Sequence, residues 1–383
     1  MSAQNPAHDL DGLLVVSLEQ AVAAPYASCK LADAGARVIK IERAEGDFAR
    51  FYDADVGGDA SYFVWLNRGK ESLTLDLKTP SDLALLKRII AKADIFIQNL
   101  APGATDRLGL ASADLRKRHK QLITCDISGY GSTGSRKDMK AYDLLVQAET
   151  GLSLITGGEN EAGRVGVSVC DIAAGMTAHQ AILQALFART KSHQGRGIEV
   201  SLFHALSDWM NVPYLQHIYG QKEIKRAGLH HVSIAPYGAY MCQTGEQVLI
   251  SIQNEREFAQ LCSDILEDEQ LARDPRFATN INRVKNRDTL NQIINQKFGQ
   301  YHADDLAEKL YKSKIAFGRL NHMADLATHP QSQFISVSTS KGTFELLAPG
   351  AVISGFSPQG GTVPDIGQDS LDIRAEFSAS DET

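Results

Sequence analysis

Apolar and polar positions follow a regular order over the first part of the chain. Residues 13–18 (LLVVSL) form a continuous apolar run of strand length, and residues 38–42 (VIKIE) form a second one. The segment between them, 23–33, has the pattern of a helix, with Pro25 tolerated in its first turn and Gly35 ending it. A strand, a helix and a strand in this order predict a βαβ unit, from which parallel sheets are built.

Strands and helices continue to alternate over the first 130 residues, and further elements follow as far as residue 202. The pattern predicts strands at 72–77, 95–98, 122–128 and 198–202, and helices at 80–92, 113–119, 141–151 and from Asp171 to about Lys191. Strands that alternate with helices are typical of a doubly wound α/β domain. We therefore expect an α/β fold with a Rossmann-like parallel sheet.

The pattern changes near residue 220. A polar, irregular stretch at 221–236 indicates a linker, and it precedes a hairpin at 237–252, a charged helical region at 256–315 and a Gly-rich, strand-like tail at 344–356. These segments predict three parts. They are a large Rossmann-like domain at 1–220, a small α+β domain at 225–325, and a C-terminal segment at 326–383 that returns to the large domain.

Composition is that of an ordinary globular protein, with 43% hydrophobic and 22% charged residues. A net charge of -7 argues against nucleic acid as a partner. No apolar run approaches the roughly 20 residues needed to cross a bilayer, so no membrane association is expected. The first ten residues, MSAQNPAHDL, lack the basic start and apolar core of a signal peptide. These features predict a cytoplasmic location.

Neither the cysteines nor the histidines predict a metal centre. The five cysteines are widely spaced and form no CxxC pair, which favours unpaired thiols in a reducing compartment: Cys29, Cys125, Cys170, Cys242 and Cys262. The neighbouring His230 and His231 have no nearby pair of carboxylates, and we treat them as ordinary residues at the edge of a pocket. No metal site is therefore expected.

Residues 129–134 (GYGSTG) match the G-x-G-x-x-G fingerprint of dinucleotide-binding domains and follow a predicted strand. In that fingerprint a helix starts at once and holds the pyrophosphate at its N-terminus. Here the loop-like residues 135–138 (SRKD) follow, and the first strand–helix turn, 19–24, contains no glycine. The pattern therefore argues against nicotinamide chemistry.

Asp171 stands at the start of the longest predicted helix and has two interpretations. An aspartate there usually acts as an N-cap that accepts hydrogen bonds from the first backbone N–H groups. The same position would keep the carboxylate ionised, so that it could act as a nucleophile near neutral pH. The pattern alone leaves both open.

Basic side chains recur at the strand ends and loops of the α/β half: Arg43, Arg68, Lys70, Arg107 and Lys140. Any one of them could simply be a solvated surface cation. As a set at the carboxyl ends of the strands they could bind phosphates, because α/β sheets bind ligands at that edge.

Several segments together resemble one protein family. They are LDG at 10–12, AGARVIKIE at 34–42, NRGK at 67–70, NLAPG at 99–103, DRLG at 106–109, YD at 142–143 and GRG at 195–197. In order and spacing they resemble the class III CoA transferases, the family of formyl-CoA transferase and carnitine–CoA transferase. The resemblance covers essentially the whole chain and implies a Rossmann-like large domain, a smaller domain, and two ring-shaped chains interlocked as a homodimer.

The resemblance also implies site residues. The segment CDIAAG at 170–175 is similar to the family's segment around its nucleophilic aspartate, so Asp171 is expected to carry the chemistry. Tyr142 and Asp143 fall where the formyl-CoA enzyme has a Tyr-Glu pair at the reacting centre, and are expected to be catalytic. Contacts to CoA are implied for a further set: Arg43 and Arg107 at its phosphates, and Asn99, Lys140, Val22 and Ala23 elsewhere.

The implied reaction moves CoA from an acyl-CoA thioester to a small carboxylic acid through an aspartyl-CoA thioester. CoA is then a co-substrate, and no tightly bound cofactor is implied. The formyl-CoA enzymes have a glutamine where this chain has Val22, and they carry a run of four glycines that this chain lacks. These departures disfavour formate and oxalate. Residues 17–25 look more like enzymes that act on C4–C5 dicarboxylates such as mesaconate, itaconate, citramalate or succinate.

Two alternatives remain open. The first is a 2-methylacyl-CoA racemase of the same superfamily, which needs a histidine where this chain has Tyr142. The second is a CoA-binding relative without catalytic activity, against which the intact segment around Asp171 argues.

Overall fold

The computed structural model describes residues 8–355 and 360–378. The first seven of the ten N-terminal residues compared with a signal peptide therefore lie outside the described residues. Phe356, at the end of the strand predicted in the tail, lies outside them as well. The chain divides into two compact units. The first comprises residues 1–152, 165–215 and 333–383, and the second comprises 153–164 and 216–332.

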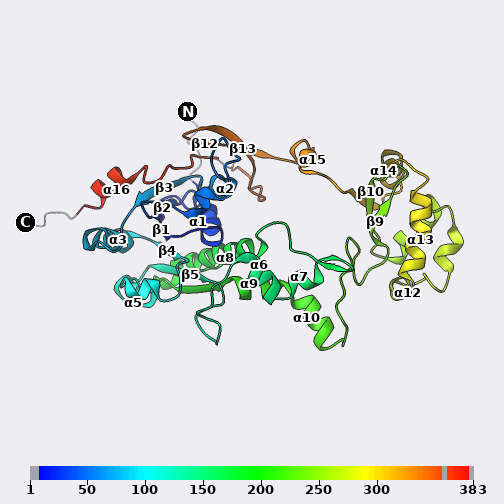
Figure 1. The fold of residues 1–383 in the computed structure, drawn as a ribbon, viewed down its shortest axis with the longest axis horizontal. Coiled ribbons are helices and arrows are strands. Elements are labelled where there is room, and N and C mark those ends of the chain that lie inside the picture. The colour runs from blue at the N-terminus through cyan, green and yellow to red at the C-terminus, as the bar shows by residue number, and fades with distance from the viewer. Residues whose placement is uncertain (1–7, 356–359, 379–383) are drawn as a thin grey trace, which may run out of the picture. The chain divides into compact units, whose positions relative to one another are not determined.

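The first unit is built on a parallel sheet of six strands in the order β3-β2-β1-β4-β5-β8 (Figure 1). The strands are β1 (Leu14–Leu18), β2 (Arg37–Glu42), β3 (Lys70–Thr74), β4 (Ile95–Gln98), β5 (Ile123–Ser128) and β8 (Gly197–Ser201). This is the doubly wound order, which reverses direction between β1 and β4. The predicted α/β class with a Rossmann-like sheet is confirmed.

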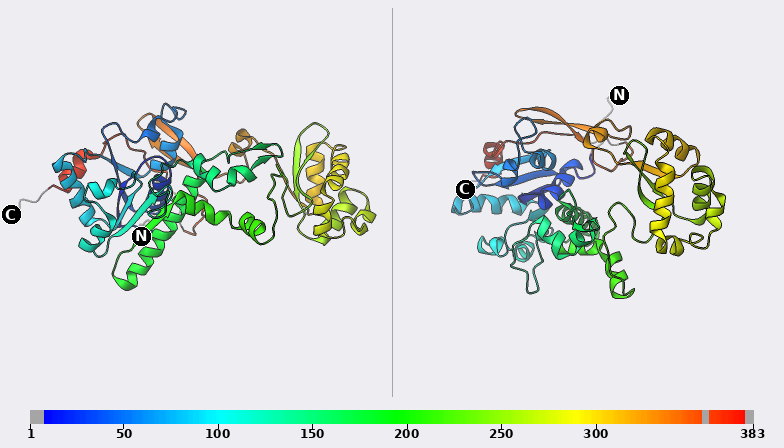
Figure 2. Two further views of the ribbon diagram at one scale, coloured as in Figure 1. Left: turned by 60° about the horizontal axis from the view of Figure 1, so that its bottom comes forward. Right: turned by 45° about the vertical axis from the view of Figure 1, so that its right-hand side comes forward.

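Helices cover both faces of this sheet, and the strand residues alternate accordingly. Val15 and Ile95 share a core with α1 (Ala23–Asp33) and α8 (Val169–Ser192). Val16 and Phe96, one position further along each strand, share the opposite core, to which α3 (Pro80–Lys92), α5 (Ser112–Arg118) and α16 (Ser370–Glu376) contribute. Figure 2 shows these helices around the sheet. Continuous apolar strands are thus explained by burial on both sides.

The remaining elements of the first unit are short. They are η1 (Phe48–Phe51), α2 (Ser61–Asn67), α4 (Ala104–Arg107), α6 (Asp143–Glu149), α9 (Leu202–Trp209) and the antiparallel pair β12 (Phe334–Thr339) and β13 (Gly342–Leu347). Two further helices, α7 (Leu152–Ile155) and α10 (Asn211–Ile218), cross the boundary between the units.

Helices α1 and α8 approach unusually closely. A Cβ atom added at Gly175 of α8 would lie 2.7 Å from the carbonyl oxygen of Ala23 and 2.8 Å from the Cβ of Tyr26. Only glycine therefore allows the two backbones to meet at this distance. The contact brings the first turn of α1 against the second turn of α8.

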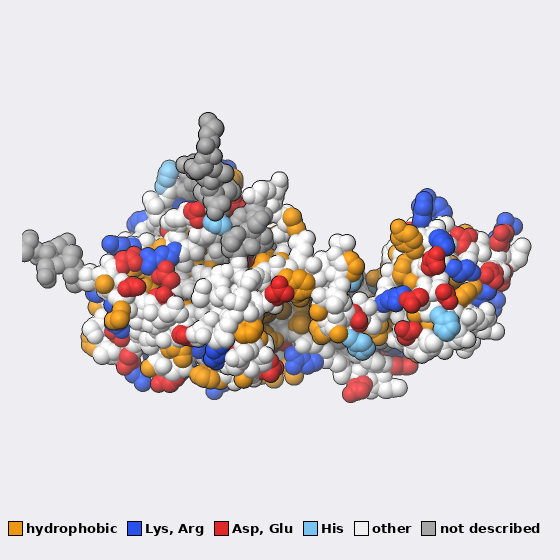
Figure 3. All heavy atoms as spheres, turned by 90° about the horizontal axis from the view of Figure 1, so that it is seen from above, with side chains coloured by type: hydrophobic (Ala, Val, Ile, Leu, Met, Phe, Trp, Pro, Cys, Tyr) orange, Lys and Arg blue, Asp and Glu red, His pale blue; other side chains and the backbone are white. Residues whose placement is uncertain are grey.

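The second unit has its own core, in which a three-stranded antiparallel sheet packs against helices. Its strands are β9 (Tyr237–Met241), β10 (Gln247–Ser251) and β11 (Ala316–Arg319), and a short pair joins β6 (Gly157–Gly158) to β7 (Glu161–Ala162). Its helices are α11 (Glu255–Gln260), η2 (Leu261–Ile265), η3 (Glu269–Arg273), α12 (Asn280–Lys285), α13 (Arg287–Phe298), α14 (Ala303–Lys312) and α15 (Met323–Ala327). Basic and acidic side chains are interspersed on its visible face, at the right of Figure 3.

Most predicted elements exist, and the differences lie at strand ends and in the tail. The helices at 23–33 and 80–92 and the strand at 95–98 are confirmed. The strand predicted at 72–77 spans 70–74 instead, because it pairs with β2 from Val38 onward. The strand predicted in the tail at 344–356 exists but spans 342–347 instead. It pairs with β12, which the sequence analysis missed.

Three further observations concern the cysteines, metal ligands and membrane-spanning helices in the described part of the chain. All five cysteines are buried and unpaired, as predicted. Among residues 8–355 and 360–378, no group of histidine, cysteine and carboxylate side chains could hold a metal ion. None of the helices in these ranges is both long enough and apolar enough to span a bilayer.

Candidate active site

The first turn of α8 lies at the carboxyl edge of the sheet, where doubly wound proteins bind ligands. Helix α8 leads into β8, and β8 runs parallel to β5, so α8 runs back against the strand direction and starts at their carboxyl ends. Helix α1 starts at the same edge directly after β1, and Gly175 packs the two helices together near these starts. Asp171, the third residue of α8, therefore lies at the predicted edge.

Asp171 does not cap its own helix. The N-cap position is Ser168, whose side chain makes no capping hydrogen bond. The first backbone N–H groups are capped by Asp143 of α6, whose Oδ1 accepts hydrogen bonds from the amides of Cys170 at 2.7 Å and of Asp171 at 3.3 Å. The N-cap interpretation of Asp171 was therefore wrong, since a second aspartate supplies the cap from outside the helix.

The side chain of Asp171 is left without a hydrogen-bonding partner among the described residues. It is partly buried. Burial, and then the negative charge of Asp143, raise the pKa of Asp171 from 3.8 to about 7. The expectation that the helix N-terminus would keep this carboxylate readily ionised was wrong, because burial and a like charge outweigh the helix dipole here.

Aromatic residues border the start of α8, and the sequence analysis missed them. The hydroxyl of Tyr62, on α2, lies 2.8 Å from the hydroxyl of Ser168. The ring of Tyr52, which follows η1, meets that of Tyr62 edge-on at 5.9 Å. Burial, and then the charges of Asp47 and Asp171, raise the pKa of Tyr52 to about 12. No pattern in the sequence linked these positions, since each comes from a different loop or short helix.

Tyr142 lies beside this group but is largely exposed. It is the N-cap residue of α6, immediately before Asp143, and 66% of its surface is accessible. Its phenol is close enough to Tyr52 to contribute to the raised pKa of Tyr52. The structure thus brings Asp171, Asp143 and Tyr142 together.

Three of the predicted CoA contacts are exposed cations on loops at the carboxyl edge. Arg43 directly follows β2, Arg107 ends α4, and Lys140 lies in the loop that follows β5. In the described part of the chain none of these three side chains has a hydrogen-bonding or ionic partner. They are therefore available to an anionic ligand.

Arg68 and Lys70, the other two cations of that set, are structural. Arg68 is buried and pairs with Asp33 at 2.6 Å. Lys70 is the first residue of β3 and so stands at the amino end of that strand. Its Nζ lies 2.7 Å from a carboxylate oxygen of Glu19, and both side chains are fully buried. The suggestion that these two residues face a ligand was wrong.

Asn99, Val22 and Ala23 meet at the point where the strand order reverses. Asn99 follows β4, and its side chain accepts a hydrogen bond from the backbone N–H of Gln20 at 2.9 Å and donates one to its carbonyl at 2.8 Å. Asn99 thereby fixes the turn that leads to Val22 and Ala23, both of which are buried. Its amide is already used by the protein, so its role is to shape this turn.

Buried charged side chains also stabilise the turn between β1 and α1. Asp47 accepts a hydrogen bond from the N–H of Ala21, whose φ of 64° is left-handed, and it pairs with Lys40 at 2.8 Å. Lys40 also lies 3.5 Å from Glu19. Burial alone would raise the pKa of Glu19, but the charges of Lys70 and Lys40 outweigh it and lower the pKa to about 2. This network fixes the turn between β1 and α1.

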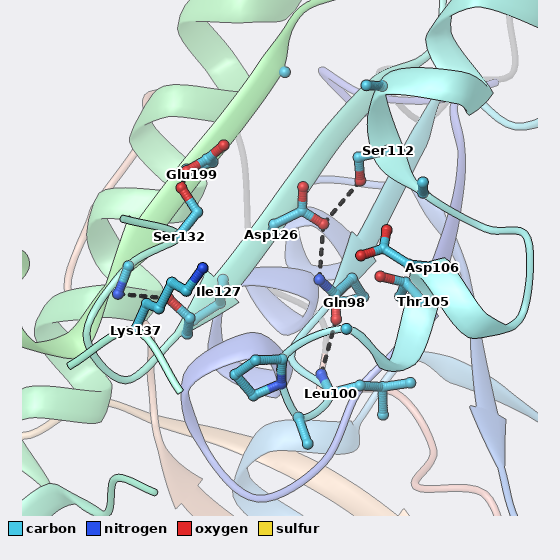
Figure 4. A pocket seen from close by; sticks show the side chains of 18 of the residues that line it. Gln98, Leu100, Thr105, Asp106, Ser112, Asp126, Ile127, Ser132, Lys137 and Glu199 are labelled. Carbon is cyan, nitrogen blue, oxygen red and sulfur yellow. Dashed lines mark hydrogen bonds between the residues drawn. The ribbon is translucent and has the colours of Figure 1, made fainter. Parts of the chain in front are cut away.

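A cavity of about 540 Å³ opens elsewhere at the sheet, between α5 and the loop after β5 (Figure 4). On its wall, Oδ1 of Asp126 accepts hydrogen bonds from Gln98 and Ser112, each at 2.8 Å. None of the predicted CoA contacts lines the cavity, and its acidic side chains outnumber its basic ones. It is therefore poorly suited to phosphate groups and is separate from the start of α8.

The remaining motifs keep their ordinary interpretations. The glycine-rich segment 129–134 is followed by loop until α6 begins at Asp143, so no helix N-terminus is available for a pyrophosphate. His230 packs edge-on against Tyr240 and lines a hollow of the second unit, while His231 stacks on Tyr237.

Comparison with known proteins identifies the family. The sequence profile of CoA-transferase family III matches residues 10–370. The chain is 32% identical to human succinyl-CoA:glutarate CoA-transferase over 333 residues, which cover 86% of this chain and 76% of the human protein. It is also 32% identical to acetyl-CoA:oxalate CoA-transferase of Acetobacter aceti, with 98% and 97% of the two chains covered.

A solved structure agrees. The CAIB/BAIF family protein from Brucella suis superimposes with a TM-score of 0.83 at 32% identity, covering 98% of this chain and all of that one. The protein therefore belongs to CoA-transferase family III. It is an enzyme that transfers CoA, and CoA is its co-substrate.

Proposed function

We propose that this CoA transferase moves CoA from an acyl-CoA to a small dicarboxylate through a covalent intermediate on Asp171. The observation that carries the proposal is the free carboxylate of Asp171 at the start of α8, where Asp143 has taken over the capping of the helix. A carboxylate without hydrogen-bond donors is a better nucleophile than one that caps a helix, because it has no such bonds to break.

In the first half-reaction an oxygen of ionised Asp171 attacks the thioester carbonyl of the donor. The C–S bond breaks, and CoA leaves as the thiolate, so that a mixed anhydride of Asp171 and the donor acid remains. The thiolate then attacks the aspartyl carbonyl and expels the donor carboxylate, which leaves an aspartyl-CoA thioester. The acceptor carboxylate repeats these steps in reverse and regenerates Asp171. Water takes no part, so the free energy of the thioester is retained.

The tetrahedral oxyanions of these steps need hydrogen-bond donors. Backbone N–H groups at the start of α8 would be natural donors, but those of Cys170 and Asp171 already donate to Asp143. The first turn of α1 is the alternative, because its N-cap residue, Val22, makes no side-chain cap. We assign the oxyanion donors to the backbone of Val22 and Ala23, next to the point where Gly175 contacts Ala23.

The nucleotide end of CoA is assigned to the exposed cations. Arg43 and Arg107 are proposed to contact its phosphates, and Lys140 a further part of the cofactor. Their exposure and lack of ionic partners among the described residues support this assignment. The net charge of -7 provides no diffuse positive field, so individual cations must supply the attraction. Asn99 is proposed to act through the turn at Gln20 that it holds.

The acceptor is proposed to be a C4–C5 dicarboxylate such as mesaconate, itaconate, citramalate or succinate. A relative whose name specifies succinyl-CoA and glutarate supports a dicarboxylate of this size. A relative named for oxalate is equally similar to this chain, so the exclusion of oxalate stays a prediction.

We also propose an interlocked homodimer in the cytoplasm. Sedimentation at nanomolar concentration tests the dimer: folded monomers would contradict it.

The function is tested by offering a panel of dicarboxylic and monocarboxylic acids with succinyl-CoA and acetyl-CoA and identifying the new thioesters by mass spectrometry. We expect CoA exchange with C4–C5 dicarboxylates and none with acids of unrelated size. A control without acceptor, in deuterated water with a 2-methylacyl-CoA, separates transfer from racemisation. We expect no deuterium at the α-carbon, because Tyr142 is a poor proton shuttle compared with histidine. Deuterium uptake at a catalytic rate would contradict the transferase assignment.

A further inference from the structure

Asp143, which caps α8, is itself hydrogen-bonded to a buried glutamine that has no role in the proposed reaction. Gln147 stands one helical turn after Asp143 on α6 and has 0% of its surface exposed. Its side-chain Nε2 donates to Oδ2 of Asp143 at 2.6 Å. Its Oε1 accepts a hydrogen bond from the backbone N–H of Val165 at 2.9 Å. A continuous chain of hydrogen bonds therefore runs from Val165 through Gln147 and Asp143 to the start of α8.

The direction of every bond in this chain is fixed by its two ends. The backbone N–H of Val165 can only donate, so the carbonyl oxygen of Gln147 must face it. The amide NH₂ of Gln147 must then face Asp143, where it too can only donate. At the other end the N–H of Cys170 donates to the second oxygen of Asp143. Both oxygens of Asp143 are thus acceptors, which is the ionised form of the carboxylate.

We infer that Gln147 is a positioning residue that holds Asp143 ionised and turned toward α8, so that the proton shared by the Asp143–Asp171 pair belongs to Asp171. The inference rests on the proposed role of Asp171 as nucleophile. Its consequence is that Asp171 is the member of the pair that titrates near neutral pH. Once ionised, Asp171 is then a more basic, and hence stronger, nucleophile than an ordinary aspartate.

The charged and titratable groups around Asp171 come from two other elements. Asp143 faces it from the start of α6, and Tyr52 faces it from the end of η1, where Tyr142 also approaches Tyr52. Burial raises the pKa of Tyr52 to about 12, so that phenol stays neutral, and Asp143 is the charge that raises the pKa of Asp171. Moving that charge is therefore the direct way to test the role of Gln147.

An exchange of the two side-chain types moves the charge without changing the direction of any hydrogen bond. In the double variant Asp143→Asn, Gln147→Glu, the new amide oxygen accepts from Cys170 and its NH₂ donates to the new carboxylate, which still accepts from Val165. The single variant Asp143→Asn cannot form all the hydrogen bonds of this chain. In any orientation of the two amides, either their NH₂ groups face each other or one NH₂ faces a backbone N–H. The variant Gln184→Glu, at an exposed position of α8, adds a charge away from the chain and serves as control.

The experiment measures thermal unfolding and the titration of Asp171 in these variants, without substrate. The titration is followed by carbon-13 NMR of carboxyl-labelled aspartate, and the signal of Asp171 is identified by its absence in Asp171→Asn. We expect Asp143→Asn to unfold at a lower temperature than the wild type and the double variant to recover most of the loss. In the double variant the pKa of Asp171 should fall, because the negative charge moves from Asp143 to position 147, one helical turn further along α6.

Equal unfolding temperatures for the single and double variants would overturn the inference, and so would an Asp171 titration that is unchanged in the double variant. Neither readout involves transfer of CoA. If the wild type transfers no CoA while both readouts follow the expectation, the proposed function fails and the arrangement of Gln147 stands. If the wild type transfers CoA and either readout fails, the role of Gln147 is wrong and the proposed function remains.

Discussion

Oδ1 of Asp143 lies 3.3 Å from the backbone nitrogen of Asp171 and 2.7 Å from that of Cys170. Two aspartates therefore divide between them the tasks that one aspartate at a helix start usually combines. Asp143 accepts the hydrogen bonds of the helix terminus, and Asp171 keeps a carboxylate without partners among the described residues. This division is what makes Asp171 available for a reaction.

Replacing Asp171 by Asn should abolish CoA transfer and leave the fold intact. An amide cannot attack a thioester, and the helix keeps its cap because Asp143 provides it. Transfer is measured by thioester exchange, and folding by circular dichroism and thermal unfolding. Transfer at a rate close to that of the wild type would end the proposal.

The same variant should be more stable than the wild type at pH 8. The pKa of Asp171 is raised from 3.8 to about 7, so its stabilising contribution is present below pH 3.8 and is lost as the pH rises toward 7. The neutral amide of the variant avoids this loss, because it does not ionise. Unfolding in urea at several pH values should show the advantage of the variant growing between pH 4 and pH 7 and then levelling off. An advantage independent of pH would contradict the raised pKa.

The pH dependence of kcat/KM should rise through about pH 7 and then level off. The nucleophile must be ionised in the free enzyme, and the pKa of Asp171 is about 7. The acceptor dicarboxylates are already ionised in this range. A limb that instead lies near pH 4 would mean that Asp171 titrates as an ordinary aspartate.

Replacing Arg107 by Ala should weaken binding of CoA esters by about tenfold or more. A charge-assisted hydrogen bond to an ionised partner contributes roughly 1.5–3 kcal/mol, and 1.4 kcal/mol corresponds to a factor of ten in Kd. Titration calorimetry with a CoA ester measures the change. Lys117, an exposed cation of α5 that pairs with Asp114, gives the matched control, and Lys117→Ala should bind as the wild type does. An unchanged Kd for Arg107→Ala would remove it from the proposed site.

Replacing Gly175 by Ala should destabilise the first unit by about 1–3 kcal/mol, as overpacking in a core does. The helix itself gains about 1 kcal/mol from alanine, but the new methyl group would lie 2.7 Å from the carbonyl oxygen of Ala23. Because the contact joins the first turn of α1 to the second turn of α8, close to Asp171, transfer should fall as well. Gly158→Ala, where open space surrounds the added methyl group, should change neither quantity. Wild-type stability of Gly175→Ala would contradict the close approach.

Much of the fold could be predicted because its signals are local. Apolar strands such as 95–98 and the helix at 23–33 follow from the spacing of apolar residues alone, and the strands of a doubly wound sheet are buried on both faces. Elements defined by distant partners were harder. Strand β12 has no strong pattern of its own and exists because it pairs with β13, and β3 takes its boundaries from β2.

The candidate site divides in the same way. Asp171 could be located from its helix, and the exposed Arg107 from its place at a strand-to-helix loop. The surroundings of Asp171 could not, because Tyr52, Tyr62 and Gln147 come from separate elements and meet its neighbourhood only in the folded chain. Lys70 shows the opposite error. The sequence pattern suggested a cation available to a ligand, but Lys70 is buried and forms an ion pair with Glu19, which is distant in sequence. Long-range pairing decides which charges face solvent.

Capture of the aspartyl-CoA intermediate tests the role of Asp171 most directly. The enzyme is mixed with succinyl-CoA without an acceptor acid, quenched in acid, digested and examined by mass spectrometry. We expect CoA joined as a thioester to the peptide that contains Asp171, and no such adduct in Asp171→Asn. CoA attached at another residue, or undiminished exchange in the variant, would contradict it.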